Sequence, residues 1–573
     1  MQVLIAEEIC TNFTMLAPIA LMFIALVLPI TRQHLRKLEG LFNYIARRKR
    51  LSILLVGVST FIGAAIVSYV FYWPIPSIHD EFSYLLAADT FAQGRLANPT
   101  HPMWIHFETF HVLQQPTYVS KYLPGQGLML AFGQIITGQP IVGVWLSMAL
   151  ACATTCWMLQ AWLPPRWALL GSLLMLLKLG LLSYWSQSFW GGGVATIGGA
   201  LLFGAMRRIT KKQTVANTCW LGLGLVILAN SRPFEGLVVS FLAIGYLLFW
   251  LSSKKTLQFA VVIRQIVVPL AVILTVAGLA MFYYNWRTTG NPWQMAYQIY
   301  EKTYGNLPIF IWSKPGKPVS YNHAEMALLY QSWSLNQYKA HLFSLFSFWD
   351  VTKLKIRDFW DFFFGWGFIV PLVALPFILK NRWVRLALLI CLSLSIALLL
   401  EIFNYAHYFA PGVCLLYFLV LQCMRRIYFW RWQNKPTGRL IVWSIPLYYI
   451  LLIVLTVVLR LSPFFYVTPN PWEPTRTLES HWSFKRAELL SKLTSTEGQH
   501  LVIVNYLPGH SFHEGWVFNR ADIDNAKVVW ARNISVERNC ELINYFQGRK
   551  VWFLEVGDDF NMSLTAYPIN LCK

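Results

Sequence analysis

The sequence predicts a polytopic α-helical membrane protein that carries a small α/β domain at its C-terminal end. Of its 573 residues, 56% are hydrophobic and 16% are aromatic, whereas only 13% are charged. Apolar runs long enough to cross a bilayer as helices, about 20 residues, recur along most of the chain. Beyond residue 461 the composition becomes that of an ordinary soluble protein.

About twelve apolar runs are expected to cross the membrane, within a module that covers residues 1–460. They cover residues 15–30, 51–73, 140–163, 167–184, 191–206, 218–229, 236–250, 266–284, 365–379, 386–400, 409–423 and 440–459. The segment 461–573 follows as a separate soluble domain.

The positive charges lie in short segments between these runs. The formal net charge of +21 would suit a nucleic-acid partner, but such a surface gathers in one soluble module. Here Lys and Arg are spread over several loops, around residues 47–50, 207–212, 254–255, 380–385 and 425–431. Since cytoplasmic loops carry such an excess, these loops are oriented inward, and both termini and the longer loops face outward. No nucleic-acid partner is expected.

The first outer loop, over residues 74–138, opens with Asp80 and Glu81. Neighbouring carboxylates at a membrane boundary mark a candidate functional site. The alternative is that Asp80 only caps the helix that Glu81 begins. Further along the same loop lie Lys121 and Tyr122.

Two helices are predicted within this loop. Residues 81–95 read as an amphipathic helix near the membrane surface, and residues 128–136 read as an apolar helix too short to span. Three consecutive glycines in the next outer loop, 191–193, favour either close packing of helices or a phosphate at a helix N-terminus.

Further outer loops place polar side chains at the same depth. Arg232 and Glu235 form either a surface ion pair of little consequence or a site that offers Arg232 to an anionic ligand. The long loop 285–360 includes Arg287 and many Tyr and Trp residues, which suit an aromatic interfacial belt as well as a sugar-stacking surface.

The last outer loop holds Glu401 and His407. The histidine is either a hydrogen-bonded structural residue or a contact for a substrate.

The C-terminal segment is predicted to be a small α/β domain. Strands are expected at 501–504, 528–530 and 551–554, with helices at 482–493 and 537–547, so that a βαβ unit closes the chain. Cys540 and Cys572 lie in this segment, and a disulfide between them is left open.

Outer loops that converge would combine carboxylates, cations and aromatic rings. This set suits transfer of a sugar from a lipid phosphate to a hydroxyl, because a carboxylate can accept the proton of the hydroxyl and cations can stabilise the departing phosphate. The sequence has neither a Gly-x-Gly-x-x-Gly motif nor a P-loop, so a nucleotide-sugar donor is not expected. A lipid or polysaccharide transporter and a non-catalytic envelope-assembly subunit stay open, although acids at helix ends favour an enzyme.

The order of these signals resembles the GT-C superfamily of membrane glycosyltransferases. The likeness is strongest to bacterial relatives of protein O-mannosyltransferases and of the aminoarabinose transferase that modifies lipid A. It covers roughly residues 51–412. The motifs that carry it are Asp80-Glu81 after an apolar helix, Lys121-Tyr122-Leu123-Pro124-Gly125-Gln126, Tyr284-Asn285 and Thr289-Gly290-Asn291-Pro292.

This resemblance implies a hexosyl- or pentosyltransferase of the bacterial inner membrane that acts on the outer face. The donor would be a polyprenyl-phosphate sugar, the acceptor a lipid, glycan or protein, and the anomeric carbon would be inverted. The catalytic carboxylate of the family corresponds to Asp80, with Glu81 beside it. Many relatives have a second acid in the next outer loop, and this chain has none there, so Glu235 or Glu401 could replace it. No metal ligand is assigned, although a divalent cation is possible.

Overall fold

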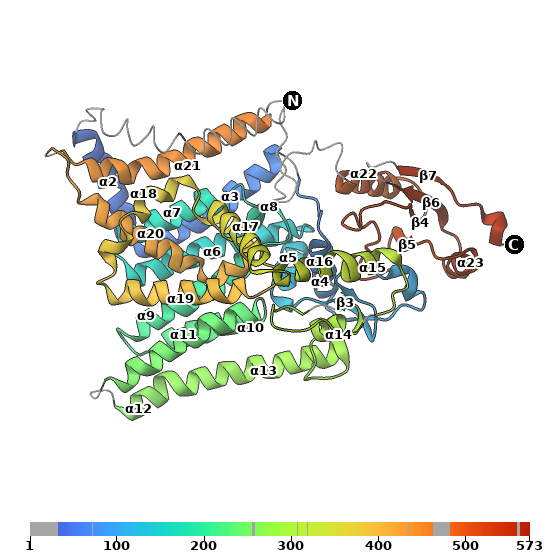
Figure 1. Ribbon diagram of the computed structural model, residues 1–573, viewed down its shortest axis with the longest axis horizontal. Helices are drawn as coiled ribbons and strands as arrows, with labels where there is room; N and C mark the ends of the chain where they lie inside the picture. The colour runs from blue at the N-terminus through green and yellow to red at the C-terminus, as the bar shows by residue number, and fades with distance from the viewer. Residues whose placement is uncertain are drawn as a thin grey trace.

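The structure is a computed structural model that describes residues 16, 32–71, 73–254, 258–305, 308–317, 319–433, 435–461, 482–557 and 562–572. Long helices fill one end of the molecule, and short helices, small strands and the C-terminal sheet fill the other (Figure 1). The apolar segments of the chain thus lie at the end with the long helices, and the polar segments lie at the other end.

Seven helical segments in the described residues are long and apolar enough to cross a membrane. They are α3 (Lys49–Phe71), α6 (Ile141–Trp162), α11 (Pro233–Ser252), the run Phe259–Thr289 of α12, η3 and α13 (Phe259–Val262, Ile263–Val267 and Val268–Thr289), α19 (Arg382–Leu399), the run Ala406–Tyr428 of η7 and α20 (Ala406–Gly412 and Val413–Tyr428), and Thr437–Val458 of α21 (Thr437–Leu461). The predicted class, a polytopic helical membrane protein, is confirmed.

This count is lower than the predicted twelve because several apolar runs form short or interrupted helices. The run 167–184 is divided into α7 (Pro165–Met175), η2 (Leu176–Gly180) and α8 (Tyr184–Gln187), and 365–379 into η5 (Trp366–Phe368), α18 (Ile369–Leu372) and η6 (Leu375–Ile378). The runs 191–206 and 218–229 form α9 (Gly193–Ile209) and α10 (Val215–Ala229), which are shorter than the seven spans. The run 15–30 lies outside the described residues apart from residue 16.

The short helix α9 is almost completely buried by its neighbours. All of its residues except Arg207 and Arg208 are buried, because it packs between α6 and α10. An added Cβ at Gly192 would lie 2.5 Å from the Trp185 ring, and one at Gly193 would lie 2.7 Å from the Ser147 hydroxyl. Close packing therefore accounts for the three glycines.

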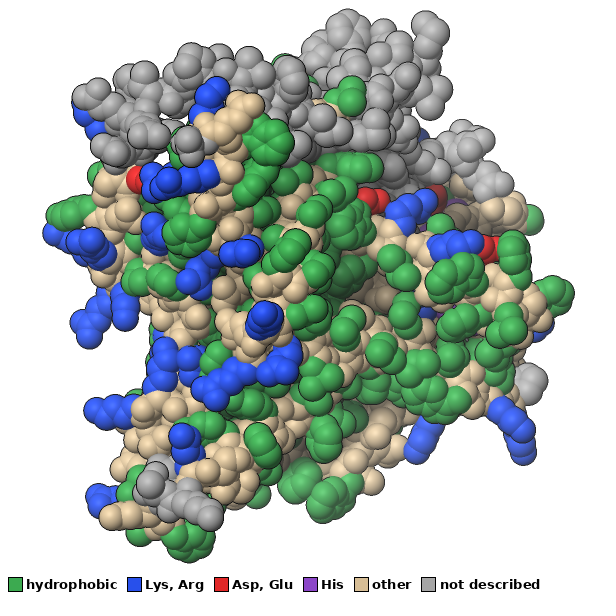
Figure 2. Space-filling view, turned by 60° about the vertical axis from the view of Figure 1, so that its left-hand side comes forward, with side chains coloured by type: hydrophobic (Ala, Val, Ile, Leu, Met, Phe, Trp, Pro, Cys, Tyr) green, Lys and Arg blue, Asp and Glu red, His purple; other side chains and the backbone are tan. Residues whose placement is uncertain are grey.

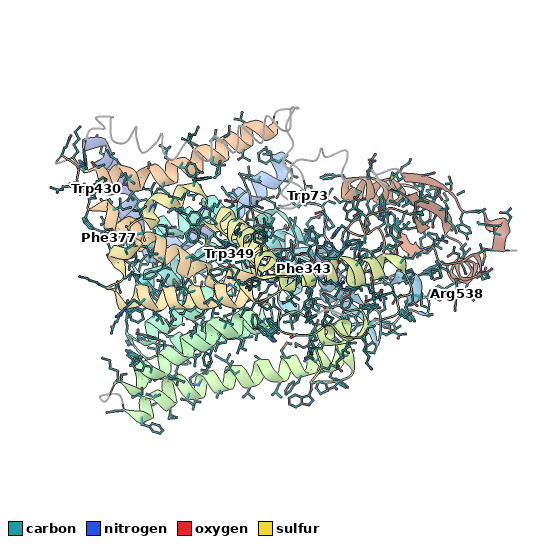
Figure 3. The ribbon with its side chains drawn as sticks, viewed as in Figure 1. Trp73, Phe343, Trp349, Phe377, Trp430 and Arg538 are labelled. Atoms are coloured by element: carbon teal, nitrogen blue, oxygen red, sulfur yellow. A yellow bond between two sulfur atoms is a disulfide. The ribbon has the colours of Figure 1, made fainter. Side chains whose placement is uncertain are left out.

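Basic residues mark one end of the spans. Arg207 and Arg208 lie in the last turn of α9, Arg425 and Arg426 in the last turn of α20, and α19 begins at Arg382. In Figure 2, Lys and Arg side chains gather over one side of the visible face and apolar side chains cover much of the rest. Exposed aromatic side chains lie toward both ends, with Trp430 and Phe377 on the basic side and Trp73, Phe343 and Trp349 toward the polar side (Figure 3). Such belts are typical of the two interfaces of a bilayer.

The polar end is built from the loops between spans. In the first loop, α4 (His79–Ala92) and α5 (Pro124–Thr137) flank a small antiparallel sheet of order β1-β3-β2 (Asn98–Pro99, Thr117–Ser120, Val112–Leu113) and η1 (Trp104–Phe107). The long loop adds α14 (Ala296–Thr303), α15 (Ala324–Ala327), η4 (Leu328–Trp333), α16 (Ser334–Leu342) and α17 (Leu345–Phe363). At the basic end of the spans, α2 (Arg32–Arg47) precedes α3.

Helix α4 lacks the exposed polar face of the amphipathic helix that the sequence predicted over residues 81–95. Ten of its 14 residues are buried, since it packs against α5 on one side and the C-terminal domain on another. Helix α5 does match its prediction, because Leu128, Phe132, Ile135 and Ile136 are exposed on one apolar face. That face suits the membrane interface.

The C-terminal domain contains α22 (Trp482–Ser495), β4 (His500–Tyr506), β5 (Val528–Arg532), α23 (Val536–Tyr545), β6 (Lys550–Val556), β7 (Met562–Ala566) and η10 (Ile569–Cys572). Its sheet has the order β5-β4-β6-β7, in which the first three strands are parallel and β7 is antiparallel. The predicted β5-α23-β6 unit is present. A disulfide joins Cys540 and Cys572.

The C-terminal domain shares its core with the first loop. Phe82 of α4 stacks on Phe518 with ring centroids 4.1 Å apart, and Leu86 belongs to the same apolar cluster as Leu501 and Ile503. Although the chain divides in sequence near residue 461, its C-terminal domain and first polar loop are packed as one body.

Candidate active site

Asp80 lies in the first turn of α4, at the end of the spans opposite the basic loops. Its side chain is 20% exposed. The Tyr122 hydroxyl donates a hydrogen bond to Oδ1, and Nε2 of His111 lies 3.7 Å from Oδ2. Asp80 is therefore held by side chains but still open to a ligand.

Glu81, rather than Asp80, satisfies the start of α4. Its Oε2 accepts hydrogen bonds from the backbone N–H groups of Ser77 and Ile78, at 2.8 and 3.1 Å. Its Oε1 accepts another from Phe189 at 2.8 Å, across the chain. Because these bonds occupy a carboxylate that is only 1% exposed, Glu81 joins two polar loops and does not face a ligand.

Burial and the groups around Asp80 act on its pKa in opposite directions. Burial raises the pKa above its usual 3.8, while the hydrogen bond from Tyr122 and the positive charges of Lys121 and Arg232 lower it. The net shift is upward. Asp80 thus holds a proton more readily than a surface aspartate.

Lys121 follows strand β3 and is buried. Its ammonium lies 3.1 Å from Glu301 Oε1 and within 5.4 Å of the ring centroids of Tyr122, Tyr297 and Tyr300. The lysine is therefore a fixed positive charge next to Tyr122, the residue that donates a hydrogen bond to Asp80.

Arg232 precedes α11 and is 20% exposed. Its guanidinium lies 4.3 Å from the ring centroid of Tyr408 and 3.6 Å from Glu235 Oε1. Glu235 is only 6% exposed, so this contact is not the surface ion pair that the sequence left open. The loops of Lys121 and Arg232 are tied together where Gly125 N–H donates to the Asn230 carbonyl at 2.9 Å.

Glu401 is buried beside this arginine, between α19 and η7. Burial and the Glu235 carboxylate together raise its pKa to about 8, against the opposing positive charges of Arg232 and Lys355. The candidates for a second acid, Glu235 and Glu401, therefore both lie within the electrostatic reach of Arg232.

His407 and Arg287 occupy different positions from the rest. The His407 ring is 1% exposed, packs 4.4 Å from the Trp190 ring centroid, and its Nδ1 lies 3.1 Å from the Tyr184 hydroxyl. Arg287 is exposed on α13, with Tyr283 as its hydrogen-bond partner at 3.4 Å. His407 is thus buried among aromatic side chains, and Arg287 lies on the exposed surface of α13.

Sequence reasoning missed several residues of the cluster. The Tyr84 ring stacks on the Tyr122 ring with centroids 4.6 Å apart. Burial and the negative charge of Asp80 raise the pKa of Tyr405. The Tyr408 ring centroid lies 4.3 Å from the Arg232 guanidinium. Tyrosines are so frequent in this chain that no spacing distinguished them.

His111 was also not singled out. Its backbone has φ 62°, a left-handed conformation that is rare for a non-glycine residue. Its carbonyl accepts hydrogen bonds from Ser83 at 2.6 Å and from Lys121 N–H at 3.1 Å. Burial, Lys121 and His79 lower its pKa well below 6.5, so the ring is neutral beside Asp80.

The described residues contain no group of three His, Cys, Asp or Glu side chains placed to hold a metal ion.

The fold and the site define a polytopic helical membrane protein with a partly open carboxylate in a tyrosine-rich cluster at one end of its spans. No protein-family model matches the chain, and no curated protein matches its sequence. Solved structures that are similar to it include the oligosaccharyltransferase of Archaeoglobus fulgidus in its apo form, with a TM-score of 0.46 and 10% identity over 88% of this chain and 69% of that one.

The chain is likewise similar to ArnT from Cupriavidus metallidurans, with a TM-score of 0.46 and 10% identity over 87% of this chain and 92% of that one. A second structure of the archaeal enzyme, AglB in complex with an inhibitory peptide and a dolichol-phosphate, has a TM-score of 0.43 and 11% identity over 87% and 69% of the two chains. These likenesses concern the course of the chain and do not bear on substrate or mechanism.

Proposed function

We propose that this chain is a membrane glycosyltransferase that moves a monosaccharide from a polyprenyl-phosphate donor to an acceptor hydroxyl. The observation that carries the proposal is Asp80: a partly exposed carboxylate at the polar end of the spans, bonded to Tyr122 and within reach of the charges of Lys121 and Arg232. A lipid-linked sugar phosphate presents its reactive carbon at this depth.

In the proposed reaction Asp80 is the general base. Its carboxylate takes the proton of the acceptor hydroxyl as the oxygen attacks the anomeric carbon, and the bond between that carbon and the phosphate oxygen breaks. Attack from the face opposite the phosphate inverts the anomeric carbon. The raised pKa of Asp80 makes it a better proton acceptor near neutral pH than a surface aspartate.

The departing polyprenyl phosphate carries the negative charge that the reaction develops. Arg232 is the cation suited to it, because its planar guanidinium matches phosphate geometry and is partly exposed. Lys121 is already paired with Glu301 and adds positive potential at a greater remove.

The side of the membrane is proposed from charge and disulfide chemistry. Basic loops gather at the end opposite Asp80, which favours the cytoplasm for those loops and the outer face for the site. A disulfide in the C-terminal domain suits an oxidising compartment such as the bacterial periplasm. We therefore propose the bacterial inner membrane, with a lipid, glycan or protein as acceptor.

The test compares membranes that contain the wild-type chain, Asp80→Asn or Asp358→Asn at equal protein levels. A panel of radiolabelled polyprenyl-phosphate monosaccharides serves as donor, and label in envelope material is measured. Asp358 is an exposed carboxylate on α17, so its variant is a matched control. We expect transfer to be lost with Asp80→Asn alone. Equal transfer by both variants would refute the role of Asp80, and absence of label with the wild-type chain would favour a transporter or an assembly subunit.

A further inference from the structure

The polar end contains a large cavity whose lining includes none of the predicted site residues. Its volume is about 670 Å³, and it lies between the first loop and the long loop that contains α14 and α15. Its lining residues are Thr100, Trp104, Glu108, Leu113, Gln115, Pro116, Thr303, Tyr304, Ser320, Tyr321, Asn322 and Met326. Three aromatic rings and six further polar side chains thus line one hollow.

The polar groups of this cavity are arranged around a buried carboxylate. Glu108 is 3% exposed and accepts hydrogen bonds from the Tyr304 hydroxyl at 2.8 Å and from Asn322 Nδ2 at 2.7 Å. Nε2 of His323 lies 3.5 Å from it, but burial lowers the pKa of that histidine to about 3, so the ring is neutral. The carboxylate is fixed in place by neutral donors that line or border the cavity.

The nearest cation is already compensated. Arg532 of the C-terminal domain donates to the Glu108 carbonyl at 2.6 Å and to Glu325 at 2.8 Å, and it is 2% exposed. An anionic ligand would meet the Glu108 carboxylate, and the described lining of the cavity contains no Lys or Arg to compensate its charge. A ligand with hydroxyl groups can instead donate to Glu108 and exchange hydrogen bonds with the exposed amides of Gln115 and Asn322.

A chain of contacts links the cavity to Asp80. The Tyr304 ring lies 4.9 Å from that of Tyr300, and the Tyr300 hydroxyl accepts a hydrogen bond from His111 N–H at 2.7 Å. His111 in turn borders Asp80. Two residues, Tyr300 and His111, therefore connect the lining of the cavity to the proposed base.

We infer that this cavity binds a neutral sugar unit of a glycan acceptor, away from the hydroxyl that reacts. Trp104, Tyr304 and Tyr321 offer aromatic faces, and the carboxylate, amides and hydroxyls match the hydroxyls of a sugar ring. That the bound glycan is the acceptor rests on the proposed function, whereas the binding of a glycan does not. Among lipid, glycan and protein acceptors, this site selects the glycan.

The test measures binding without transfer. Saturation-transfer difference NMR is recorded on the detergent-solubilised full chain with a panel of neutral di-, tri- and tetrasaccharides. We expect at least one of them to bind, and Trp104→Ala to weaken that binding roughly five- to tenfold, as loss of one stacking face implies. Trp104→Phe should retain most of it. Trp293→Ala is the matched control, because Trp293 is 76% exposed and is not part of the lining.

A second variant guards against misfolding. Gln115 is exposed at the rim, so Gln115→Ala should fold normally and still weaken binding. The inference is overturned if no oligosaccharide binds, or if Trp104→Ala and Gln115→Ala bind as well as the wild type. Asp80→Asn, measured in this binding assay and in the transfer assay, separates the two proposals: retained binding with unaltered transfer would leave the cavity as a glycan site and remove Asp80 as base.

Discussion

Glu81 Oε1 accepts a hydrogen bond from the backbone N–H of Phe189 at 2.8 Å, which ties α4 to the segment before α9. The same carboxylate accepts from Ser77 and Ile78. Asp80, one residue earlier, is positioned by this connection. The two neighbouring acids therefore have different tasks: Glu81 holds loops together, and Asp80 faces the proposed substrate.

Glu81→Gln is expected to lower the stability of the folded protein. An amide can accept through its oxygen, but its NH₂ group would face a backbone N–H that has lost its acceptor, at a cost of about 1–3 kcal/mol. Denaturant unfolding in detergent measures the change, and the exposed Glu497→Gln is the control. Unchanged stability combined with lost transfer would instead make Glu81 a reacting group.

The effect of Glu81 on stability should depend on pH. Burial raises its pKa from 4.5 to about 7, so the folded chain binds this proton more tightly than the unfolded chain. The resulting stabilisation is fully present below about pH 4.5 and is lost as the pH rises to 7. The stability of the wild type relative to Glu81→Gln should therefore decrease across this range. A constant difference would show that the carboxylate does not titrate there.

Tyr122→Phe is expected to move the acid limb of the transfer reaction to higher pH. The tyrosine hydroxyl stabilises the ionised form of Asp80, so its removal raises the pKa of a base that must be ionised to act. A hydrogen bond to a charged group is worth about 1.5–3 kcal/mol, which corresponds to a shift of roughly 1–2 pH units. The pH profile of kcat/KM reports this shift. Tyr338→Phe, which removes a hydrogen bond to the Ser313 carbonyl, should leave the profile unchanged.

Arg232→Ala is expected to raise KM for the donor more than KM for the acceptor, because the phosphate belongs to the donor. Loss of one charge-assisted contact suggests an increase of roughly 10- to 100-fold. Arg287→Ala should change neither value, since Arg287 is exposed on α13 and contacts Tyr283. Equal effects of Arg232→Ala on both substrates would contradict a phosphate contact.

Cys540 and Cys572 form a disulfide. We therefore expect peptide mapping under non-reducing conditions to recover the two cysteines in one linked fragment. Cys540→Ser should lower the stability of the C-terminal domain by about 2–4 kcal/mol, because the bond constrains the unfolded chain. Free alkylation of both thiols in protein from intact cells would place this domain in a reducing compartment.

The span helices and the βαβ unit were predictable because hydrophobic length and short β-rich runs are local signals. The burial of α4 was not, because its partners Phe518 and Ala521 lie more than 400 residues downstream. Asp80 was proposed from its place after an apolar run, and its role stays a prediction. His111 and Tyr405 carried no local signal, since their roles come from loops that meet only in the folded chain.

The docking of the C-terminal sheet on α4 has a consequence for biosynthesis. Phe82 stacks on Phe518, and Asp89 Oδ2 accepts from the Ala521 N–H at 2.9 Å, so the helix that carries Asp80 is completed by the end of the polypeptide. A nascent chain would insert its spans long before this helix gains its partners. A chain truncated before Phe518 would then lose the proposed activity as fully as Asp80→Asn, although the seven spans of the described residues had been made.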